Sequence, residues 1–431
     1  MSNPFLIREV RAIQVLDSRG DPTIEVSIVT SGGGIGRAIA PAGASRGKYE
    51  AVEVRDVDSR MYKGRGVRRA VENVNNYIGP AIQGLDARRQ REIDNVMIQI
   101  DGTPNKSRLG ANAMIATSLA VAKAAADTAK LPLFQYLGGI HSRILPIPML
   151  NIINGGVHAG NELSVQEFMI VPLGFDTFSD AIRAAVEVYK ELKAVIKERY
   201  GPSAINVGDE GGYAPPMRLT DEALQALEMA VKRAGYELGK DIFISLDAAA
   251  SQFYDEGSQT YDIDGRKLRR EELLEYWLDL VSRYPILSIE DPFYEEDFDM
   301  YSELRRKTKG RTLIVGDDLT VTNIERLVKA IEKRAIDAVI VKPNQVGTLT
   351  ETLDFIDLAK HNGIATIISH RSGESEDTSI AHLAVAVGGP FIKTGAPCRG
   401  ERTAKYNELL RIEDYLGGEA IFAAKLLPRR G

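Results

Sequence analysis

Six ionisable residues stand directly after short apolar runs in the second half of this 431-residue chain. In chain order they are Asp247, Glu290, Asp317, Lys342, His370 and Lys393. Neighbouring members lie 23 to 43 residues apart, which fits one strand and one helix per unit. A parallel barrel collects the C-terminal ends of its strands at one rim, so we expect these six side chains to share one site.

Three of the six are acids that come from successive strand ends: Asp247, Glu290 and Asp317. Each acid alone is more often a helix cap or an ion-pair partner. Three of them in successive strand-end positions favour a metal site instead. Oxygen ligands without a Cys or His cluster favour magnesium over zinc.

Lys342 and Lys393 are the two lysines of this set, and either one alone is typical of a salt bridge. Two lysines beside a divalent cation would each disfavour protonation of the other, and the cation adds to this effect. A neutral amine near the working pH is what a general base needs. The natural target is a C–H proton next to a carboxylate, because metal and lysine together can hold the doubly charged intermediate.

A glycine-lined acidic loop spans residues 206–213 and contains Glu210. Glycines let the backbone approach a ligand, and they also form ordinary turns. Beside a lysine base, Glu210 is a candidate general acid, and Glu167 would help to keep it protonated through like-charge repulsion. A base on one face of the substrate and an acid on the other is the arrangement for eliminating water.

The segment 369–375 follows the seventh strand candidate and leads into a helix. Arg371 offers a bidentate fork for phosphate, Ser372 a hydroxyl group, and the helix N-terminus a favourable dipole. The alternative is that Ser372 or Ser375 simply caps that helix. Late barrel loops often bind phosphate, which favours the first interpretation. Two further glycine-rich loops, 154–160 and 43–47, are candidate lids or inert turns.

The elements that must position these residues fall into two parts. Strands at 10–16, 23–30 and 35–41, followed by helices at 67–77, 87–98 and 111–130, predict a small α+β domain over residues 1–135. From Pro146 onward there are eight strand candidates, namely 148–153, 167–172 and the six apolar runs at 243–246, 286–289, 313–316, 338–341, 365–369 and 391–392. We therefore predict a (β/α)8 barrel domain over residues 140–431.

Barrel helices are predicted at 178–200, 221–235, 270–283, 323–335, 353–362 and 375–387. Thr322 and Glu325 have capping-box spacing at the start of the fourth of these helices. Glu167 precedes its apolar run, whereas the later charged residues follow theirs. If Glu167 shares the site, the second strand runs antiparallel to the others, and the barrel begins β-β-α-α.

Bulk properties exclude several classes of function. The chain has 54 basic and 60 acidic residues and a net charge of −6, so nothing calls for nucleic acid or an anionic membrane. Cys398 is the only cysteine, so no internal disulfide forms, as in a reducing compartment. The sequence shows no signal peptide and no apolar run long enough to span a membrane, so we expect a soluble cytoplasmic protein.

These motifs, in one order over nearly the whole chain, resemble those of the enolase family. The segments that carry the resemblance are 17–20, 43–45, 154–156, 158–161, 166–170, 208–212, 288–293, 317–323, 342, 344–345, 369–374, 393–397 and 406–412. The resemblance implies a magnesium-dependent, reversible dehydration of 2-phosphoglycerate to phosphoenolpyruvate in glycolysis and gluconeogenesis. It also implies a β-β-α-α-(βα)6 barrel, two Mg²⁺ per active site in the substrate complex, and a homodimer or larger homo-oligomer.

The resemblance also implies a role for each matching residue. Lys342 matches the base that takes the C2 proton, and Glu210 the acid at the departing hydroxyl, assisted by Glu167. The implied magnesium ligands are Asp247, Glu290, Asp317 and, for the second ion, Ser45. The implied substrate contacts are Lys393 at the carboxylate, Arg371 and Ser372 at the phosphate, and His158, Gln166, Glu167 and His370 elsewhere in the pocket.

The lid loop departs from the family's usual Ser-Gly-Ala-Ser-Thr-Gly pattern, because Ala42 and Arg46 replace its first and fifth residues. Two rival functions stay open. An acid-sugar dehydratase or racemase of the same superfamily often has a Lys-x-Lys pair on an early barrel strand, but the pair here, 307–309, lies in a charged helical stretch. A catalytically dead binding scaffold would have lost an acid, a lysine or a metal ligand, and none is missing.

Overall fold

The computed structural model describes residues 3–43 and 47–427 of the chain. Its N-terminal part is a three-stranded antiparallel meander in the order β1 (Ile7–Leu16), β2 (Pro22–Thr30) and β3 (Ile35–Ile39). The alanine-rich helix α4 (Ala111–Thr128) packs on β2 and β3 and is buried along almost its whole length. Gly36 permits this close approach, since a Cβ there would lie 2.0 Å from the carbonyl oxygen of Ala120.

Shorter helices complete this part of the chain. They are η1 (Met61–Gly64), α1 (Arg68–Asn73), η2 (Val74–Ile78), α2 (Gly79–Ile82), α3 (Gln90–Asp101), α5 (Leu133–Gly138) and η3 (Gly139–His141). The helix expected at 67–77 is therefore α-helical only to Asn73 and continues as a π-helical turn, η2. The helix expected at 87–98 begins three residues later, at Gln90.

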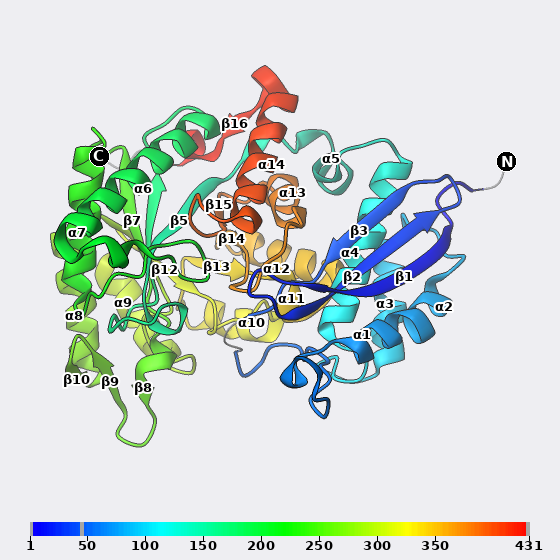
Figure 1. The fold of residues 1–431 in the computed structure, drawn as a ribbon, viewed down its shortest axis with the longest axis horizontal. Coiled ribbons are helices and arrows are strands. Elements are labelled where there is room, and N and C mark those ends of the chain that lie inside the picture. The colour runs from blue at the N-terminus through cyan, green and yellow to red at the C-terminus, as the bar shows by residue number, and fades with distance from the viewer. Residues whose placement is uncertain (1–2, 44–46, 428–431) are drawn as a thin grey trace.

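The larger part is a closed eight-stranded barrel, which Figure 1 shows beside the N-terminal sheet and its helices. Its strands in order around the barrel are β5 (Ile147–Asn154), β6 (Glu167–Pro172), β7 (Ile242–Asp247), β11 (Ile286–Glu290), β12 (Leu313–Gly316), β13 (Ala338–Val341), β14 (Ala365–Ser369) and β15 (Phe391–Lys393). β6 pairs antiparallel with β5 and β7, and every other pair is parallel. The predicted barrel and its β-β-α-α start are confirmed.

Helices cover the outside of the barrel. They are α6 (Phe178–Tyr200), α7 (Thr220–Arg233), α8 (Arg270–Arg283), α9 (Phe298–Thr308), α10 (Ile324–Glu332), α12 (Leu349–His361), α13 (Ser379–Ala386) and α14 (Gly400–Leu416). Short elements lie between them, namely β4 (Ile144–Leu145), η4 (Gly156–His158), η5 (Pro202–Ile205), η6 (Ala250–Phe253), β8 (Tyr254–Asp255), β9 (Thr260–Ile263), β10 (Arg266–Leu268), α11 (Pro343–Val346), η7 (Gly417–Glu419), β16 (Ile421–Phe422) and η8 (Ala423–Leu426). None of the predicted elements corresponds to α14 or to the β8–β9–β10 sheet.

Three predicted starts of barrel helices are wrong. α12 begins at Leu349 rather than at residue 353. α10 begins at Ile324 with Asn323 as its N-cap, whose side chain accepts a hydrogen bond from the Arg326 N–H. The Thr322 hydroxyl instead donates to Gln345 Oε1 and accepts from the Lys342 N–H, so it is not available as a cap. α13 begins at Ser379 rather than at Ser375, because residues 370–378 form an extended loop over the barrel rim.

Hydrogen bonds and ion pairs join the N-terminal part to the barrel. Asp94 of α3 is fully buried and accepts hydrogen bonds from the Ser118 hydroxyl and the Thr350 N–H. Ala42 and Gly373 exchange two backbone hydrogen bonds of 2.8 Å, which bring the end of the first part onto the loop above β14. Among the described residues, no helix is long and apolar enough to cross a membrane.

Candidate active site

The barrel register brings the predicted acids to one rim. Asp247 is the last residue of β7 and pairs in register with Glu290, the last residue of β11. β6 runs the other way, so its first residue, Glu167, lies opposite Asp247. A pocket of about 480 Å³ opens at this rim. It is lined by Gly43, Glu50, His158, Gln166, Glu167, Glu210, Asp247, Ala249, Asp291, Asp317, Asp318, Lys342, Ser369, His370, Arg371, Ser372 and Lys393.

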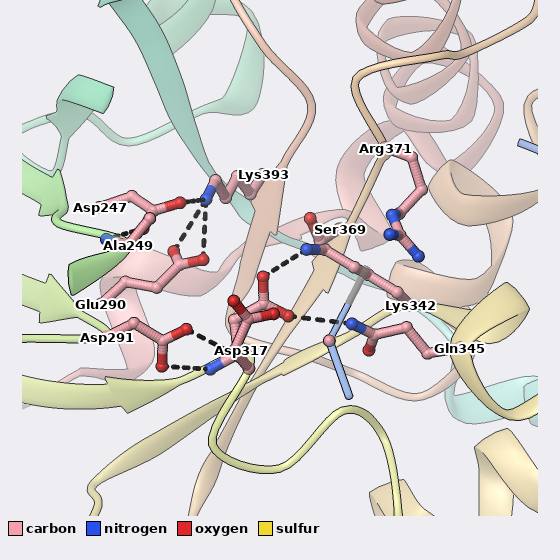
Figure 2. A network of polar contacts seen from close by, with 12 residues as sticks. Asp247, Ala249, Glu290, Asp291, Asp317, Lys342, Gln345, Ser369, Arg371 and Lys393 are labelled. Carbon is pink, nitrogen blue, oxygen red and sulfur yellow. Dashed lines mark hydrogen bonds and ion pairs between the residues drawn. The ribbon is translucent and has the colours of Figure 1, made fainter. Parts of the chain in front are cut away.

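Lys393 contacts three buried carboxylates, and Figure 2 shows two of them, Asp247 and Glu290. Its Nζ is 2.9 Å from Asp247 Oδ2, 2.9 Å from both carboxylate oxygens of Glu290, and 3.3 Å from Glu167 Oε2. Burial opposes the charge on this ammonium, but the surrounding carboxylates outweigh it and hold the pKa of Lys393 well above its usual range. Lys393 is therefore a permanent cation, suited to holding an anionic group rather than to accepting a proton.

Lys342 follows β13 and forms an ion pair with Asp317 Oδ2, as Figure 2 shows. The backbone of Lys342 is extended, which suits the residue before Pro343. Gln345 donates to the other oxygen of Asp317 at 3.2 Å. Burial disfavours the charged form of Lys342, but the Asp317 carboxylate overrides this and raises the pKa of Lys342. In the metal-free protein this amine is thus protonated and held by Asp317.

Asp291 fixes the backbone that carries Asp317. Its Oδ1 accepts hydrogen bonds of 3.0 Å from the Asp317 N–H and from the Tyr301 hydroxyl, and its Oδ2 accepts one of 2.7 Å from the Asp318 N–H. Burial and the nearby charge of Asp317 raise the pKa of Asp291 to about 7. The sequence predicted no role for Asp291, because nothing in its local pattern shows that it reaches the next strand.

The carboxylates of Asp247, Glu290 and Asp317 could hold a hard divalent cation such as magnesium. All three come from adjacent strands at the same rim and offer only oxygen atoms, the ligands that a hard divalent cation prefers. In the metal-free protein, the ammonium groups of Lys393 and Lys342 contact these carboxylates. A second acidic group, Asp291, Asp317 and Asp318, has oxygens within 4.8 Å of one another.

Glu167 and Glu210 face each other across His158. The Nδ1 atom of His158 is 3.7 Å from Glu167 Oε1 and 3.6 Å from Glu210 Oε1. Burial raises the pKa of both carboxyl groups. The charge of Glu210 adds to this, so the pKa of Glu167 lies well above its usual range, whereas His370 and His158 bring that of Glu210 well below it.

Of these two carboxyl groups, Glu167 therefore has the higher pKa in the ligand-free protein. The sequence predicted that Glu167 would help to keep Glu210 protonated, and the pKa directions run the other way in the absence of substrate. The role of Glu210 as the general acid stays a prediction. Asn151 holds Glu210 in place by donating to its Oε2 at 3.0 Å.

The glycine-lined loop reaches this position by pairing with β5. The Tyr213 N–H donates to the Ile152 carbonyl, and the Asn154 N–H donates to the Tyr213 carbonyl, with distances of 2.9 and 2.8 Å. Gly212 lies so close to the strand that a Cβ there would be 2.0 Å from Asn154 Oδ1. The glycine thus allows a close approach that seats Glu210 in the pocket.

Arg371 and Ser372 lie on the opposite part of the rim loop. The guanidinium of Arg371 donates to both oxygens of Glu50, at 2.9 and 3.2 Å, and the Ser372 hydroxyl is 3.4 Å from His158 Nε2. α13 begins only at Ser379, so its N-terminus does not directly follow Ser372. The prediction that the dipole of this helix favours phosphate binding beside Arg371 and Ser372 is therefore wrong. The alternative is also wrong, because Thr378 is the N-cap residue and the Ser379 N–H at the start of this helix donates to Asp377 Oδ1 at 2.7 Å.

Buried polar atoms without a hydrogen-bond partner among the described residues gather at this pocket. They include Gln166 Oε1, His158 Nδ1 and His370 Nε2. Buried polar groups normally have partners, so these atoms indicate a place for a polar ligand.

The structure places most of the predicted site residues around this one pocket. Glu290 does not line the pocket itself but contacts Lys393, which does. Ser45 and Arg46 fall outside the described residues. Sequence reasoning missed Glu50, Asp291, Asp318 and Arg402, which contact the predicted residues from distant parts of the chain. The segments 317–323 and 288–293 contained Asp318 and Asp291, but only as part of a family pattern.

Fold and site together define a class of protein. It is a barrel enzyme of the β-β-α-α type, with buried lysines, buried carboxyl groups and an arginine around one polar pocket. Such a site has the groups for acid–base chemistry on an anionic substrate, and its strand-end carboxylates could hold a divalent cation.

Comparisons with known proteins agree with this class. The family model described as "Enolase, N-terminal domain" matches residues 7–137, and "Enolase, C-terminal TIM barrel domain" matches residues 142–429. The chain is 57% identical to "Enolase" of Methanocaldococcus jannaschii over 417 residues, 97% of each chain. It is 55% identical to "Enolase" of Aeropyrum pernix over 421 residues, 98% of this chain and 97% of the other. The chain belongs to the enolase family.

Proposed function

We propose that this protein catalyses the magnesium-dependent, reversible dehydration of 2-phosphoglycerate to phosphoenolpyruvate. The observation that carries the proposal is the position of Lys342, a buried amine at a strand end, in the same pocket as Glu210, Lys393 and Arg371. Family membership over nearly the whole chain supports the same reaction. The enzyme is thus a carbon–oxygen lyase of glycolysis and gluconeogenesis.

Asp247, Glu290 and Asp317 would hold magnesium, and Ser45 would contribute to a second ion when the substrate binds. Magnesium there supplies positive charge for the substrate carboxylate as it gains negative charge during proton removal. Lys393 is a permanent cation of the chain at this place, and its positive charge would stabilise the substrate carboxylate from the side of the barrel interior.

Lys342 would remove the C2 proton of the substrate once its amine is neutral. Glu210, assisted by Glu167, would deliver a proton to the C3 hydroxyl as it leaves, so that water departs and the double bond forms between C2 and C3. Arg371 and Ser372 would bind the phosphate group. The hydrogen bonds between the Arg371 guanidinium and Glu50 would break when the phosphate binds. His158, Gln166 and His370 would complete the polar pocket around the substrate.

The organisation of the protein belongs to the same proposal. We propose an N-terminal domain over residues 1–135 that carries the lid loop 43–47, and a catalytic barrel domain over residues 140–431. The ranges matched by the two family models support this division. We also propose a cytoplasmic homodimer or larger homo-oligomer with no nucleic-acid or membrane partner.

An absorbance assay tests the function directly. The purified protein is mixed with 2-phosphoglycerate and Mg²⁺, and the ultraviolet absorbance of phosphoenolpyruvate is followed. We expect a rise that EDTA abolishes and that excess Mg²⁺ restores. A folded protein that produces no rise at any Mg²⁺ concentration would contradict the proposal and would favour another acid substrate or a binding role.

A further inference from the structure

Helix α14 places an arginine beneath the rim loop, and the proposed reaction gives this residue no role. Arg402 lies in the first turn of α14 and is 0% exposed. A fully buried guanidinium is rare unless hydrogen bonds satisfy it, so its partners show what it does.

Arg402 joins the two loops that carry the acid and the phosphate contacts. Its Nη1 donates to His370 Nδ1 at 2.5 Å and to the Arg371 carbonyl at 2.7 Å. Its Nη2 donates to the Ser372 carbonyl at 2.5 Å and to the Asp209 carbonyl at 3.1 Å. One planar group thus fixes consecutive residues of the rim loop against the residue before Glu210.

The contact with His370 also determines which ring nitrogen carries the hydrogen. A guanidinium only donates hydrogen bonds, so His370 Nδ1 must accept and therefore has no proton. In the neutral ring the hydrogen then lies on Nε2, which is 3.4 Å from Glu210 Oε2. The N–H of His370 consequently lies on the side of the ring near the carboxylate that is proposed to be the acid, without a hydrogen bond to it in the ligand-free protein.

We propose that Arg402 is a positioning residue, which locks His370 in the Nε2–H tautomer and holds Arg371 and Ser372 in register with Glu210. Its effect on turnover rests on the proposed function. The tautomer of His370 does not rest on it, because the contacts exist in the ligand-free protein.

The charges around His370 support this assignment. Burial, and then the positive charge of Arg402, lower the pKa of His370 to about 4, although Glu210 and Glu374 act in the opposite sense. The backbone of His370 is tied to Lys393, since the His370 N–H donates to the Lys393 carbonyl at 2.9 Å. Loss of Arg402 therefore frees Nδ1 to take a proton and gives a cation beside Glu210 at mildly acidic pH.

Nitrogen NMR of the histidine rings tests the tautomer in the intact protein. The chain has five histidines, so a ¹⁵N-histidine sample gives few signals, and His370→Gln identifies those of His370. At pH 7 without substrate we expect an unprotonated Nδ1 and a protonated Nε2. A protonated Nδ1, in either a neutral or a charged ring, would overturn the proposal.

A pair of variants tests the role of the arginine. In Arg402→Met, we expect the pKa of His370 to rise by at least one unit and turnover to fall on the order of 100-fold, the effect of misplacing reacting groups by about 1 Å. Arg399→Met is the control, because Arg399 lies just before α14 and donates to the carbonyls of Gly208 and Ser18, at 3.4 and 3.0 Å, rather than to His370. We expect Arg399→Met to leave the titration of His370 unchanged.

Two outcomes of the variant experiment would contradict the proposal. One is an unchanged titration of His370 in Arg402→Met, and the other is an equal shift in both variants. If Arg402→Met does not fold, the NMR of the unmodified protein still decides the tautomer. If the unmodified protein has the expected tautomer but no lyase activity, the assignment of Arg402 and His370 stands and the proposed function is contradicted.

Discussion

Buried charges at the pocket are balanced before any ligand arrives. Lys393 neutralises part of the Asp247, Glu290 and Glu167 cluster, and Lys342 pairs with Asp317. A buried carboxylate without a partner would be costly, so these ion pairs allow the barrel to assemble such a dense group of acids. The same pairs explain why the pKa of each lysine is raised rather than lowered in the absence of metal.

Removal of Asp317 tests the metal site at the level of a single side chain. We expect Asp317→Ala to weaken Mg²⁺ binding at least tenfold, because one of three carboxylate ligands is lost. Titration calorimetry with MgCl₂ measures this affinity. The control is Asp299→Ala, which removes an exposed carboxylate that pairs with Lys333 on the outer helices. Equal affinities for Asp317→Ala and the unmodified protein would exclude Asp317 as a ligand.

The sequence predicted the strand-end residues of the site because each one follows an apolar run. It did not predict Glu50 or Arg402, whose contacts with Arg371 and His370 span long stretches of chain. No local periodicity marks such residues, since a charged residue near a helix start or in a loop is usually solvated. Only the closure of the barrel and the packing of α14 bring them into the pocket.

At the scale of elements, α14 also supports the first barrel helix. The carboxylate of Glu413 accepts hydrogen bonds from the Phe178 N–H at 2.7 Å and the Ser179 N–H at 2.9 Å, while Thr177 caps the same end of α6. These N–H groups have no partners within their own helix, and a negative charge there also suits the helix dipole. α14 therefore contributes to both the pocket and the barrel wall.

Removal of this contact is expected to lower stability. We expect Glu413→Ala to decrease the free energy of unfolding by about 1 kcal/mol, the usual effect of losing a helix cap. Urea unfolding followed by circular dichroism measures the change. The control is Asp414→Ala, which alters the next, exposed residue of the same helix. A loss for Asp414→Ala as large as that for Glu413→Ala would contradict the capping role.

Element boundaries were predictable where hydrophobic pattern alone decides them, as for β12, β13 and β14. They were not predictable where a tertiary contact competes with a local motif. Thr322 shows this most clearly, because its hydroxyl binds Gln345 and the Lys342 N–H instead of capping α10. The small sheet β8–β9–β10 was missed because its strands have only two to four residues each.

At the scale of the whole molecule, a partly buried ion pair joins the N-terminal part to the barrel. Asp377 of the rim loop accepts hydrogen bonds from Lys123 Nζ at 2.7 Å and from the Ile39 N–H at 3.1 Å. Burial alone would raise the pKa of Asp377, but Lys123 and the hydrogen bonds bring it down to about 2. The pair thus favours the folded protein when Asp377 is ionised.

The lowered pKa predicts a pH-dependent loss of stability. The contribution of Asp377 is complete above the unfolded-state pKa near 3.8 and is lost as the pH falls through about 2. We expect Asp377→Asn to cost about 2 kcal/mol at pH 7 and roughly half of that at pH 3. Urea unfolding at both pH values measures the difference, and a cost that does not depend on pH would contradict the assignment.

The central claim is that Lys342 removes the C2 proton and that Glu210 then protonates the C3 hydroxyl, which leaves as water. Proton NMR of 2-phosphoglycerate in D₂O with Mg²⁺ tests it most directly, because exchange at C2 reports proton removal even when no product forms. We expect Glu210→Gln to retain C2 exchange but to form little phosphoenolpyruvate, whereas Lys342→Met shows no exchange. Persistent exchange in folded Lys342→Met would contradict the account.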